Sequence, residues 1–340
     1  MEIYLNLIIM FIILIIVLYL NNYENLYTTN NFILNFIDKN EGCKILSNNK
    51  EIYLQNLQKK EMLAKKCIKK NDESNKNCIE NYCKSAINWN KEQKDSVKWI
   101  LKYIVIFLQK NYPKYPSKNW NIILTNGVIE DGLPHTRLNY IVFSNKQIEI
   151  LVQCYKKRHI KKALRYVGGT MIHEHFHIFQ KTHSDFFYKL YNNLWNFREV
   201  KNIKNLDKKM KENQRLNPDT IDKKWVYYSK FNNSYYYPLA ILKDNYDSKL
   251  YDPEKLLLSV DKINNYDYSY NNKKTEIKDN LIYDNKFCKI DQIYHPNEIS
   301  AVFWSQNILD EMKIKKLPTN RKICTNNFQE YMKKYLSYPI

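Results

Sequence analysis

The chain has 340 residues and is strongly basic, with 54 lysines and arginines against 35 aspartates and glutamates. It is long enough to bury a large core in one domain or two. The formal net charge of +19 is of the kind that attracts nucleic acid, anionic lipid or acidic protein. Lysine, however, is spread along nearly the whole chain, and no RNP-like or other nucleic-acid motif is present. Composition therefore argues against nucleic acid as the main partner.

The first feature along the chain is an apolar run at residues 5–20, in which Asn6 is the only strongly polar residue. As a helix it nearly spans a hydrocarbon core of about 30 Å. It predicts a signal anchor or a signal peptide over residues 1–20. No basic region precedes it and no small-residue cleavage site follows, which favours a single-pass anchor in the membrane over a secreted protein. The flanking charges are too sparse to assign an orientation.

Residues 21–112 are expected to form a juxtamembrane segment and a helical accessory region. Residues 21–40 have the composition of a linker, while residues 51–70 and 91–110 carry helical periodicity. Four of the seven cysteines fall here, and none belongs to a C-x-x-C pair. If the chain is exported, one or two disulfides are expected within this early cluster, and the odd total leaves at least one thiol unpaired. The four are Cys43, Cys67, Cys78 and Cys83.

A proline-containing stretch at residues 111–116 marks the expected boundary of a second region, residues 113–340. Residues 120–125 and 138–143 are predicted to be β-strands joined by a turn region. Further on, the lysines of residues 201–211 are interpreted as the solvated face of a helix. Residues 264–274, which are polar and of low complexity, are expected to form a surface loop.

The most informative motif is His173-Glu174-His175-Phe176-His177, which matches H-E-x-x-H. Four residues along a helix bring two imidazoles to the same face, so His173 and His177 can bind one Zn²⁺. Glu174 is then placed to act as general base toward water at the metal. His175 points away and is left out of the site. The opposite face of the helix is apolar and predicted to enter the core. That face comprises Leu164, Val167, Gly168, Met171, Ile172 and Phe179.

A hydrolytic zinc site usually has a third protein ligand, and the chain offers two candidates. Glu298 follows Pro296-Asn297, which predict the start of a second helix. His183 occupies the third-histidine position of the metzincin pattern, but that pattern needs glycine where this chain has Gln180. Because glutamine continues a helix, His183 should be carried away from the metal. We therefore favour Glu298 and keep His183 as the alternative.

Around Glu298 the sequence Asn297-Glu298-Ile299-Ser300-Ala301 resembles the glutamate-ligand motif of gluzincins, the thermolysin-like branch of the zincin metallopeptidases. The resemblance implies Zn²⁺ as cofactor, held by His173, His177 and Glu298. Gluzincins of this type often carry an aspartate shortly after the ligand glutamate, as a partner for a histidine. That aspartate is missing here, so the partner must come from elsewhere.

The implied fold class is α+β: a mostly helical zincin-like catalytic domain with a small β-sheet over the zinc helix. An N-terminal hydrophobic helix and a helical region would precede it. In zincins the edge strand of the sheet can pair with an extended peptide. The combination of residues 132–136, the zinc helix and Asn217-Pro218-Asp219 is also similar to a zincin-like group of large DNA viruses.

The predicted function is a membrane-associated zinc metallopeptidase acting on a peptide or protein substrate. The tetrahedral oxyanion would need a further hydrogen-bond donor. The alternatives are a zincin-like binding or structural protein without activity, and a basic, membrane-tethered nucleic-acid binder. The side chains considered for the oxyanion are His135, Tyr294 and His295, together with Tyr227 and Tyr228.

Overall fold

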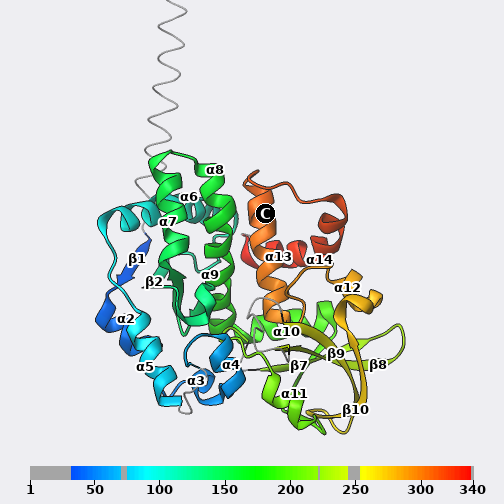
Figure 1. Cartoon of the computed structure of the whole chain (residues 1–340). Helices are drawn as coiled ribbons and strands as arrows, with labels where there is room; N and C mark the ends of the chain where they lie inside the picture. The colour runs from blue at the N-terminus through cyan, green and yellow to red at the C-terminus, as the bar shows by residue number, and fades with distance from the viewer. Residues whose placement is uncertain (1–31, 70–74, 221–222, 244–252, 338–340) are drawn as a thin grey trace, which may run out of the picture.

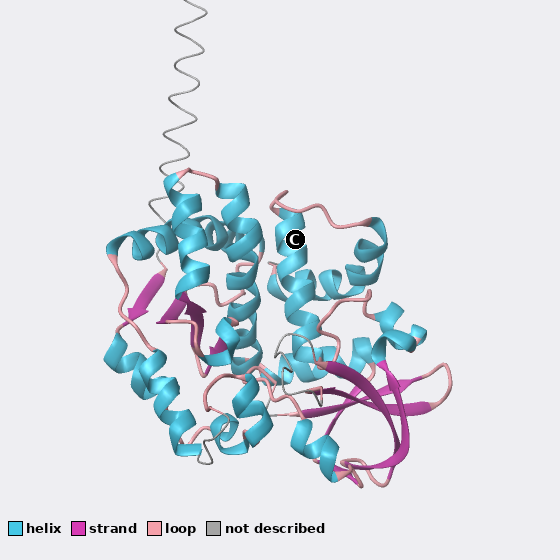
Figure 2. Ribbon diagram, in the orientation of Figure 1, coloured by secondary structure: helices cyan, strands magenta, loops and turns pink. Residues whose placement is uncertain are grey.

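The computed structural model describes residues 32–69, 75–220, 223–243 and 253–337. The chain has an α+β fold in which helices pack with two separate β-sheets (Figure 2). Among the described residues, no helix combines the length and hydrophobicity needed to span a bilayer. The predicted anchor at residues 1–20 lies outside the described part of the chain.

The first sheet has four strands in the order β1-β2-β4-β3. Strands β1, β2 and β4 run parallel to one another, and β3 pairs antiparallel with β4 at the edge of the sheet. Both predicted strands are present, although the second begins two residues later than expected. The prediction of a linker over residues 21–40 is wrong in part, because residues 33–37 form strand β1. The strands are β1 (Ile33–Ile37), β2 (Asn119–Thr125), β3 (His135–Arg137) and β4 (Tyr140–Ser144).

Strand β1 forms because a partner strand is available, which local composition does not reveal. Its residues pair one by one with β2, from Ile33 opposite Asn119 to Ile37 opposite Ile123. The adjacent helix α2 (Lys39–Leu46) begins at Asp38, whose side chain accepts a hydrogen bond from the N–H of Glu41. The end of the expected linker is therefore ordered by backbone pairing and a helix cap.

Helices from the first half of the chain surround this sheet (Figure 1). The expected helix at residues 91–110 is confirmed as α6, which starts with a capping box formed by Asn90 and Gln93. The expected helix at residues 51–70 is instead two short helices, because Leu57 and Gln58 are extended. The helices are α3 (Ile52–Asn56), α4 (Lys59–Ala64), α5 (Asn75–Ser85), α6 (Lys91–Asn111), α7 (Asn145–Lys156) and α8 (Ile160–Ala163).

Three disulfides link the chain. Two of them, Cys43–Cys83 and Cys67–Cys78, lie within the early cysteine cluster, as expected for an exported chain. The third, Cys288–Cys324, joins cysteines that are scattered in the sequence and was not predicted. Cys154 is buried and unpaired, in agreement with the odd cysteine count.

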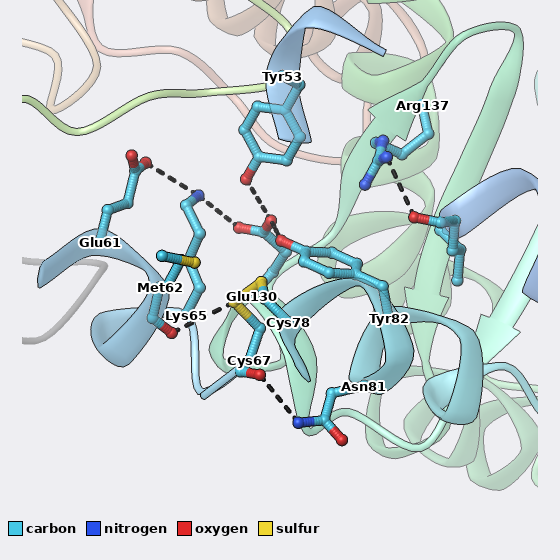
Figure 3. The surroundings of a disulfide bond; sticks show 11 residues. Tyr53, Glu61, Met62, Lys65, Cys67, Cys78, Asn81, Tyr82, Glu130 and Arg137 are labelled. Atoms are coloured by element: carbon cyan, nitrogen blue, oxygen red, sulfur yellow. Dashed lines mark hydrogen bonds and ion pairs between the residues drawn. A yellow bond between two sulfur atoms is a disulfide. The ribbon is translucent and has the colours of Figure 1, made fainter. Parts of the chain in front are cut away.

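Beside Cys67–Cys78 lies a buried ion network centred on Glu130 (Figure 3). The hydroxyls of Tyr53 and Tyr82 both donate to one oxygen of this carboxylate, and Lys65 Nζ lies 2.7 Å from the other. Glu130 belongs to η1 (Ile129–Gly132) and has a left-handed backbone with φ of 53°. The turn thus directs a charged side chain inward, where three donors compensate it.

The central helix is α9 (Gly169–Thr182), which follows the single π-helical turn η2 (Leu164–Gly168). The six apolar positions predicted for its buried face are all buried. Beside it packs α13 (Pro296–Glu311), which begins at the predicted proline (Figure 1). A Cβ at Gly169 would lie 2.9 Å from Leu309 Cδ1. Glycine at this position therefore allows the two helices to approach closely.

The second sheet has six strands in the order β5-β7-β8-β9-β10-β6. Two expectations are corrected here. Residues 264–274 lie largely in strand β10, and residues 201–211 hold a strand and the start of a helix, α11 (Lys208–Asn213). Backbone pairing with β9 makes polar β10 a strand, since such pairing does not depend on side-chain polarity. The strands are β5 (Phe197–Val200), β6 (Asn202–Lys204), β7 (Lys224–Ser229), β8 (Ser234–Ile241), β9 (Glu254–Lys262) and β10 (Asp267–Glu276).

The largest apolar core runs from α6 to the last helix, α14 (Thr319–Leu336). The expected boundary near residue 112 therefore has packing across it, and the hydroxyl of Ser337 donates to the carbonyl of Asn111 at 3.1 Å. The remaining elements are α10 (Ser184–Trp195), η3 (Ile277–Asp279) and α12 (Leu281–Lys286).

Candidate metal centre

Helix α9 presents two imidazoles to the same point. His173 and His177 stand one turn apart, and their Nε2 atoms are 3.1 Å from each other. His177 is fully buried and His173 is 14% exposed. His175, one position after Glu174, lies on the other side, where it stacks on Trp120 and bonds to Tyr115 at 2.8 Å. The helical spacing therefore separates a ligand pair from a core histidine, as the sequence predicts.

The first turn of α13 brings a carboxylate to this pair. Glu298 Oε2 lies 3.4 Å from His173 Nε2, and its Oε1 lies 3.6 Å from His177 Nε2. Donor atoms held by one tetrahedral Zn²⁺ at about 2.0–2.1 Å would be roughly 3.3 Å apart. The three side chains therefore fit the spacing of a zinc ligand set, and they form one of two clusters of metal-binding groups in the described part of the chain.

Gln180 determines which nitrogen of His177 faces this point. Its amide nitrogen donates to the carbonyl of Asn297 at 2.9 Å and to Ser300 Oγ at 2.7 Å, so its oxygen must face the imidazole. That oxygen lies 2.7 Å from His177 Nδ1, which is therefore the protonated nitrogen. His177 Nε2 keeps its lone pair for a metal. Gln180 thus supplies the histidine partner that the sequence around Glu298 lacks.

The carboxylate of Glu298 is also positioned by a hydrogen bond. Asn217 Nδ2 donates to Glu298 Oε1 at 2.7 Å. Burial alone would raise the pKa of Glu298, but the neighbouring His177 and His173 hold it at about 2. For His173, burial acts to lower the pKa, while the hydrogen bond with Glu298 raises it to about 9. Glu298 is therefore a carboxylate throughout the neutral range, as a metal ligand must be.

Glu174 lies next to the ligand pair and contacts the edge strand of the first sheet. Its Oε2 accepts a hydrogen bond from Thr136 Oγ1 at 3.0 Å. Burial raises its pKa, and the nearby carboxylate of Asp219 raises it further. Glu174, His177 and Asp219 form the second cluster of metal-binding groups among the described residues. A raised pKa suits a carboxylate that takes up a proton near neutral pH.

Asp219 closes the outer side of strand β3. It accepts a hydrogen bond from the N–H of Thr136 at 3.2 Å, and Lys181 Nζ lies 3.5 Å from it. The same lysine donates to the carbonyl of Thr136 at 3.3 Å. Both backbone groups of Thr136 are thus occupied within the chain. An extended peptide could pair with β3 at this residue only after these contacts open.

The ligand set opens into a cavity of about 330 Å³. Its walls include His173, Glu174 and Glu298 from the two helices, and Asp219 and His135 from the loops and the edge strand. A cavity of this size holds a few side chains of a peptide beside the metal ligands.

The side chains considered for oxyanion stabilisation do not all line the cavity at the metal centre. His135 lines the cavity, whereas Tyr294 and His295 line a neighbouring one. His135 Nδ1 lies 3.1 Å from the carbonyl of Leu133, so this nitrogen carries the proton and Nε2, buried and unpartnered among the described residues, is an acceptor. Burial lowers the pKa of His135, which favours this neutral form. His135 would therefore need a second proton before it could donate to an oxyanion.

The remaining candidates have contacts elsewhere. Tyr294 accepts from Asn217 Nδ2 at 3.0 Å, and His295 caps α13 by accepting from the N–H of Asn297. Tyr227 lies among the aromatic side chains of the core, and Tyr228 donates to Asn233. His183 ends α9, where Nδ1 lies 2.9 Å from Thr182 Oγ1; it belongs to neither metal-binding cluster found in the described chain.

Several side chains at the centre were not predicted as site residues. Their roles depend on contacts between segments far apart in the sequence. All of them except Arg215 lie in the segments that resemble the viral zincin-like group, but that resemblance assigned them no role. The unpredicted residues are Thr136, Gln180, Arg215, Asn217 and Asp219. Comparison of the chain with protein-family models, curated proteins and solved structures finds no match. The proposal that follows therefore depends on the geometry of the site itself.

Proposed function

We propose that this chain is a zinc-dependent metallopeptidase with a zincin-like catalytic region. His173, His177 and Glu298 would hold the metal, and Glu174 would be the general base. The observation that carries the proposal is the convergence of three lone-pair donors from α9 and α13, 3.1, 3.4 and 3.6 Å apart. A cation at this point would take the place of the proton that Glu298 otherwise stabilises on His173, and all three side chains could bind it at once.

When bound, Zn²⁺ would supply Lewis acidity toward a carbonyl and toward water. The chain's own residues would do the rest. Gln180 keeps the lone pair of His177 Nε2 turned toward the metal position. Glu174, with its raised pKa and its hydrogen bond from Thr136, is positioned to take a proton from water and to return it to the leaving amine.

The intact base supports an enzyme over a zincin-like protein that only binds. A binding or structural role would not need a buried carboxylate beside the ligands, since an unpaired buried acid is unfavourable. Glu174 is buried, and its described hydrogen-bond donor is a neutral hydroxyl. A carboxylate kept in such surroundings has a function in proton transfer.

The experiment is a zinc and cleavage measurement on the full-length protein in detergent. We expect about one zinc per chain, with cleavage of a protein substrate such as casein followed by mass spectrometry. Glu174→Gln should keep the zinc and reduce cleavage by at least about 100-fold. His177→Ala should lose the zinc, whereas His183→Ala, the matched histidine control, should keep it.

Zinc binding without cleavage by the wild-type protein would favour the binding-only alternative. Zinc-free, folded protein after metal loading would contradict the proposal altogether. In that case steeply salt-dependent DNA binding would support the basic nucleic-acid binder instead.

A further inference from the structure

Arg215 forms part of the wall of the site cavity, together with His173, Glu174 and Glu298. It follows α11, and its backbone N–H donates to the carbonyl of Ala240 in β8 at 2.9 Å. The backbone of Arg215 is therefore tied to the second sheet, while its side chain forms part of the cavity beside the metal ligands.

Among the described residues, no carboxylate forms an ion pair with the guanidinium of Arg215. Its Nη1 donates to the hydroxyl of Tyr294 at 3.3 Å, and the group lies 5.7 Å from the centre of that ring. Its Nε is buried and has no hydrogen-bond partner in the described part of the chain. A largely desolvated cation is unfavourable unless something compensates its charge. Arginine is also the side chain best suited to bind a carboxylate through two hydrogen bonds.

The other long cations of the cavity differ from Arg215. Lys65 lies 2.7 Å from Glu130 and 3.4 Å from Glu61, so its charge is neutralised within the chain. Arg165 is exposed and donates to the carbonyl of Ile314. Arg215 therefore differs from both. It is only partly exposed, and although Glu298 and Glu130 favour its positive charge, no described carboxylate forms an ion pair with it. A guanidinium held in this way is suited to bind a negatively charged group.

A second cavity of about 330 Å³ adjoins the first, and Arg215, Leu216 and Asn217 line both. Among the described residues its wall also contains three lysines, one of which pairs with Glu199, and no aspartate or glutamate. Lysines thus line the cavity that adjoins Arg215, which favours an acidic ligand running past this residue. The lysines are Lys211, Lys223 and Lys224.

Building on the proposed peptidase function, we propose that Arg215 binds a carboxylate of the substrate and that the protein acts on acidic peptides. The carboxylate can belong to an aspartate or glutamate side chain or to the peptide's C-terminus. Both present the same two oxygens to the guanidinium. The C-terminal source would make the enzyme a carboxypeptidase, whereas the side-chain source sets a sequence preference within an endopeptidase.

A purely internal role for Arg215 predicts something different. Its charge is one of those that lower the pKa of Glu298. If this were its whole function, its loss would weaken zinc binding but would affect acidic and neutral peptides equally. Discrimination between the two kinds of peptide is therefore the quantity to measure.

The test uses N-acetylated alanine hexapeptides that carry one Glu or one Gln at each position in turn, with amidated ends. A further all-alanine pair has a free or an amidated C-terminus. Binding is measured by calorimetry on the zinc-loaded, full-length Glu174→Gln protein, which separates binding from turnover. Cleavage by the zinc-loaded protein with Glu174 intact is followed by mass spectrometry. Both measurements are repeated with Arg215→Gln, Arg215→Lys and Arg165→Gln.

We expect at least one carboxylate-bearing peptide to bind about 10- to 100-fold more tightly than its neutral partner. Arg215→Gln should remove this difference while keeping the zinc, Arg215→Lys should keep part of it, and Arg165→Gln should leave it unchanged. A preference among the Glu peptides identifies the side-chain source. A preference only for the free C-terminus identifies the terminal source.

Equal binding of charged and neutral peptides would overturn the role of Arg215 even if the peptides are cleaved, and would leave the peptidase proposal standing. A carboxylate preference that depends on Arg215, without any cleavage, would support the receptor and contradict the peptidase. If no peptide is bound or cleaved, both proposals fail.

Discussion

Two buried groups of charged side chains face the same cavity, and they differ in how their charges are balanced. Around Glu130 a carboxylate is surrounded by donors, the hydroxyls of Tyr53 and Tyr82 and the ammonium of Lys65 (Figure 3). At the candidate metal centre, by contrast, two imidazoles and one carboxylate, each able to bind a metal ion, face a common point.

The difference separates a structural network from a binding site. The Glu130 network is compensated within the chain, so it needs nothing from outside and contributes to stability. At the candidate metal centre the three side chains can share a proton on His173, which a bound cation would replace. A buried ionisable cluster thus indicates function when its hydrogen-bond donors and acceptors do not match in number. Burial by itself does not indicate function.

The largest effect should come from removing a ligand of the metal centre. We expect Glu298→Ala to abolish stoichiometric zinc binding, because two imidazoles alone leave the tetrahedral site incomplete. Zinc per chain, measured by mass spectrometry after dialysis, checks this. Glu130→Gln is the matched control, since it removes a buried carboxylate from the same cavity and should leave the zinc content unchanged. Loss of zinc in both variants would break the distinction between the two groups.

The next effect is on folding. Glu130→Gln should reduce the free energy of unfolding by about 3 kcal/mol, because Lys65 loses its nearer carboxylate and keeps only Glu61 at 3.4 Å, while two buried tyrosine hydroxyls lose a charged acceptor. Urea denaturation followed by circular dichroism measures it. The double variant with Lys65→Met should recover part of the loss. A loss below about 1 kcal/mol would show that the network is not compensated as the distances indicate.

Acidification should reveal the same network. Burial would raise the pKa of Glu130, but Lys65 and the hydrogen bonds to the carboxylate lower it from 4.5 to about 2. Because the pKa is depressed by folding, the stabilisation is present above pH 4.5 and is lost as the pH falls toward 2. Its full size is about 3 kcal/mol. Unfolding free energies across this window should show a loss that is smaller in Glu130→Gln, in which Glu298 still titrates; equal pH profiles would contradict it.

A smaller effect on zinc affinity is expected from substitution of Gln180, the hydrogen-bond partner of His177. Gln180→Ala should weaken zinc binding about 10- to 100-fold, because His177 Nδ1 loses its acceptor. Gln180→Glu keeps an acceptor there and should bind zinc more tightly than Gln180→Ala. Competition with a fluorescent zinc chelator gives the affinities. Unchanged zinc affinity in Gln180→Ala would mean that the imidazole is oriented by helix packing alone.

Much of the site was predictable because its signals are local. The H-E-x-x-H spacing depends only on helical periodicity, and Pro296-Asn297 predicts the start of the helix that carries Glu298. The replacement of the metzincin glycine by Gln180 correctly predicted a helix that continues to Thr182. The second role of Gln180, as partner of His177, could not be predicted, since it depends on Asn297 and Ser300 on another helix.

The errors in the fold have the same origin. Strand β1 and most of β10 were expected to be linker and loop, because their side chains give no strong strand pattern. Each is ordered by hydrogen bonds to a neighbouring strand's backbone. Such pairing is available to almost any sequence, so composition does not predict it. The Cys288–Cys324 disulfide was likewise missed because spacing alone does not show which cysteines meet.

By itself, therefore, the sequence determined that His173 and His177 share one helix face with Glu174 beside them, where the helix of Glu298 begins, and the cysteine-rich early region. These depend on interactions between residues a few positions apart. Only the tertiary structure decided that Glu298 reaches the histidines, that Asp219 and Lys181 occupy the edge strand, and that Arg215 lies in the cavity wall without a carboxylate. Those features result from contacts between distant segments, whose positions are set by the packing of the whole core.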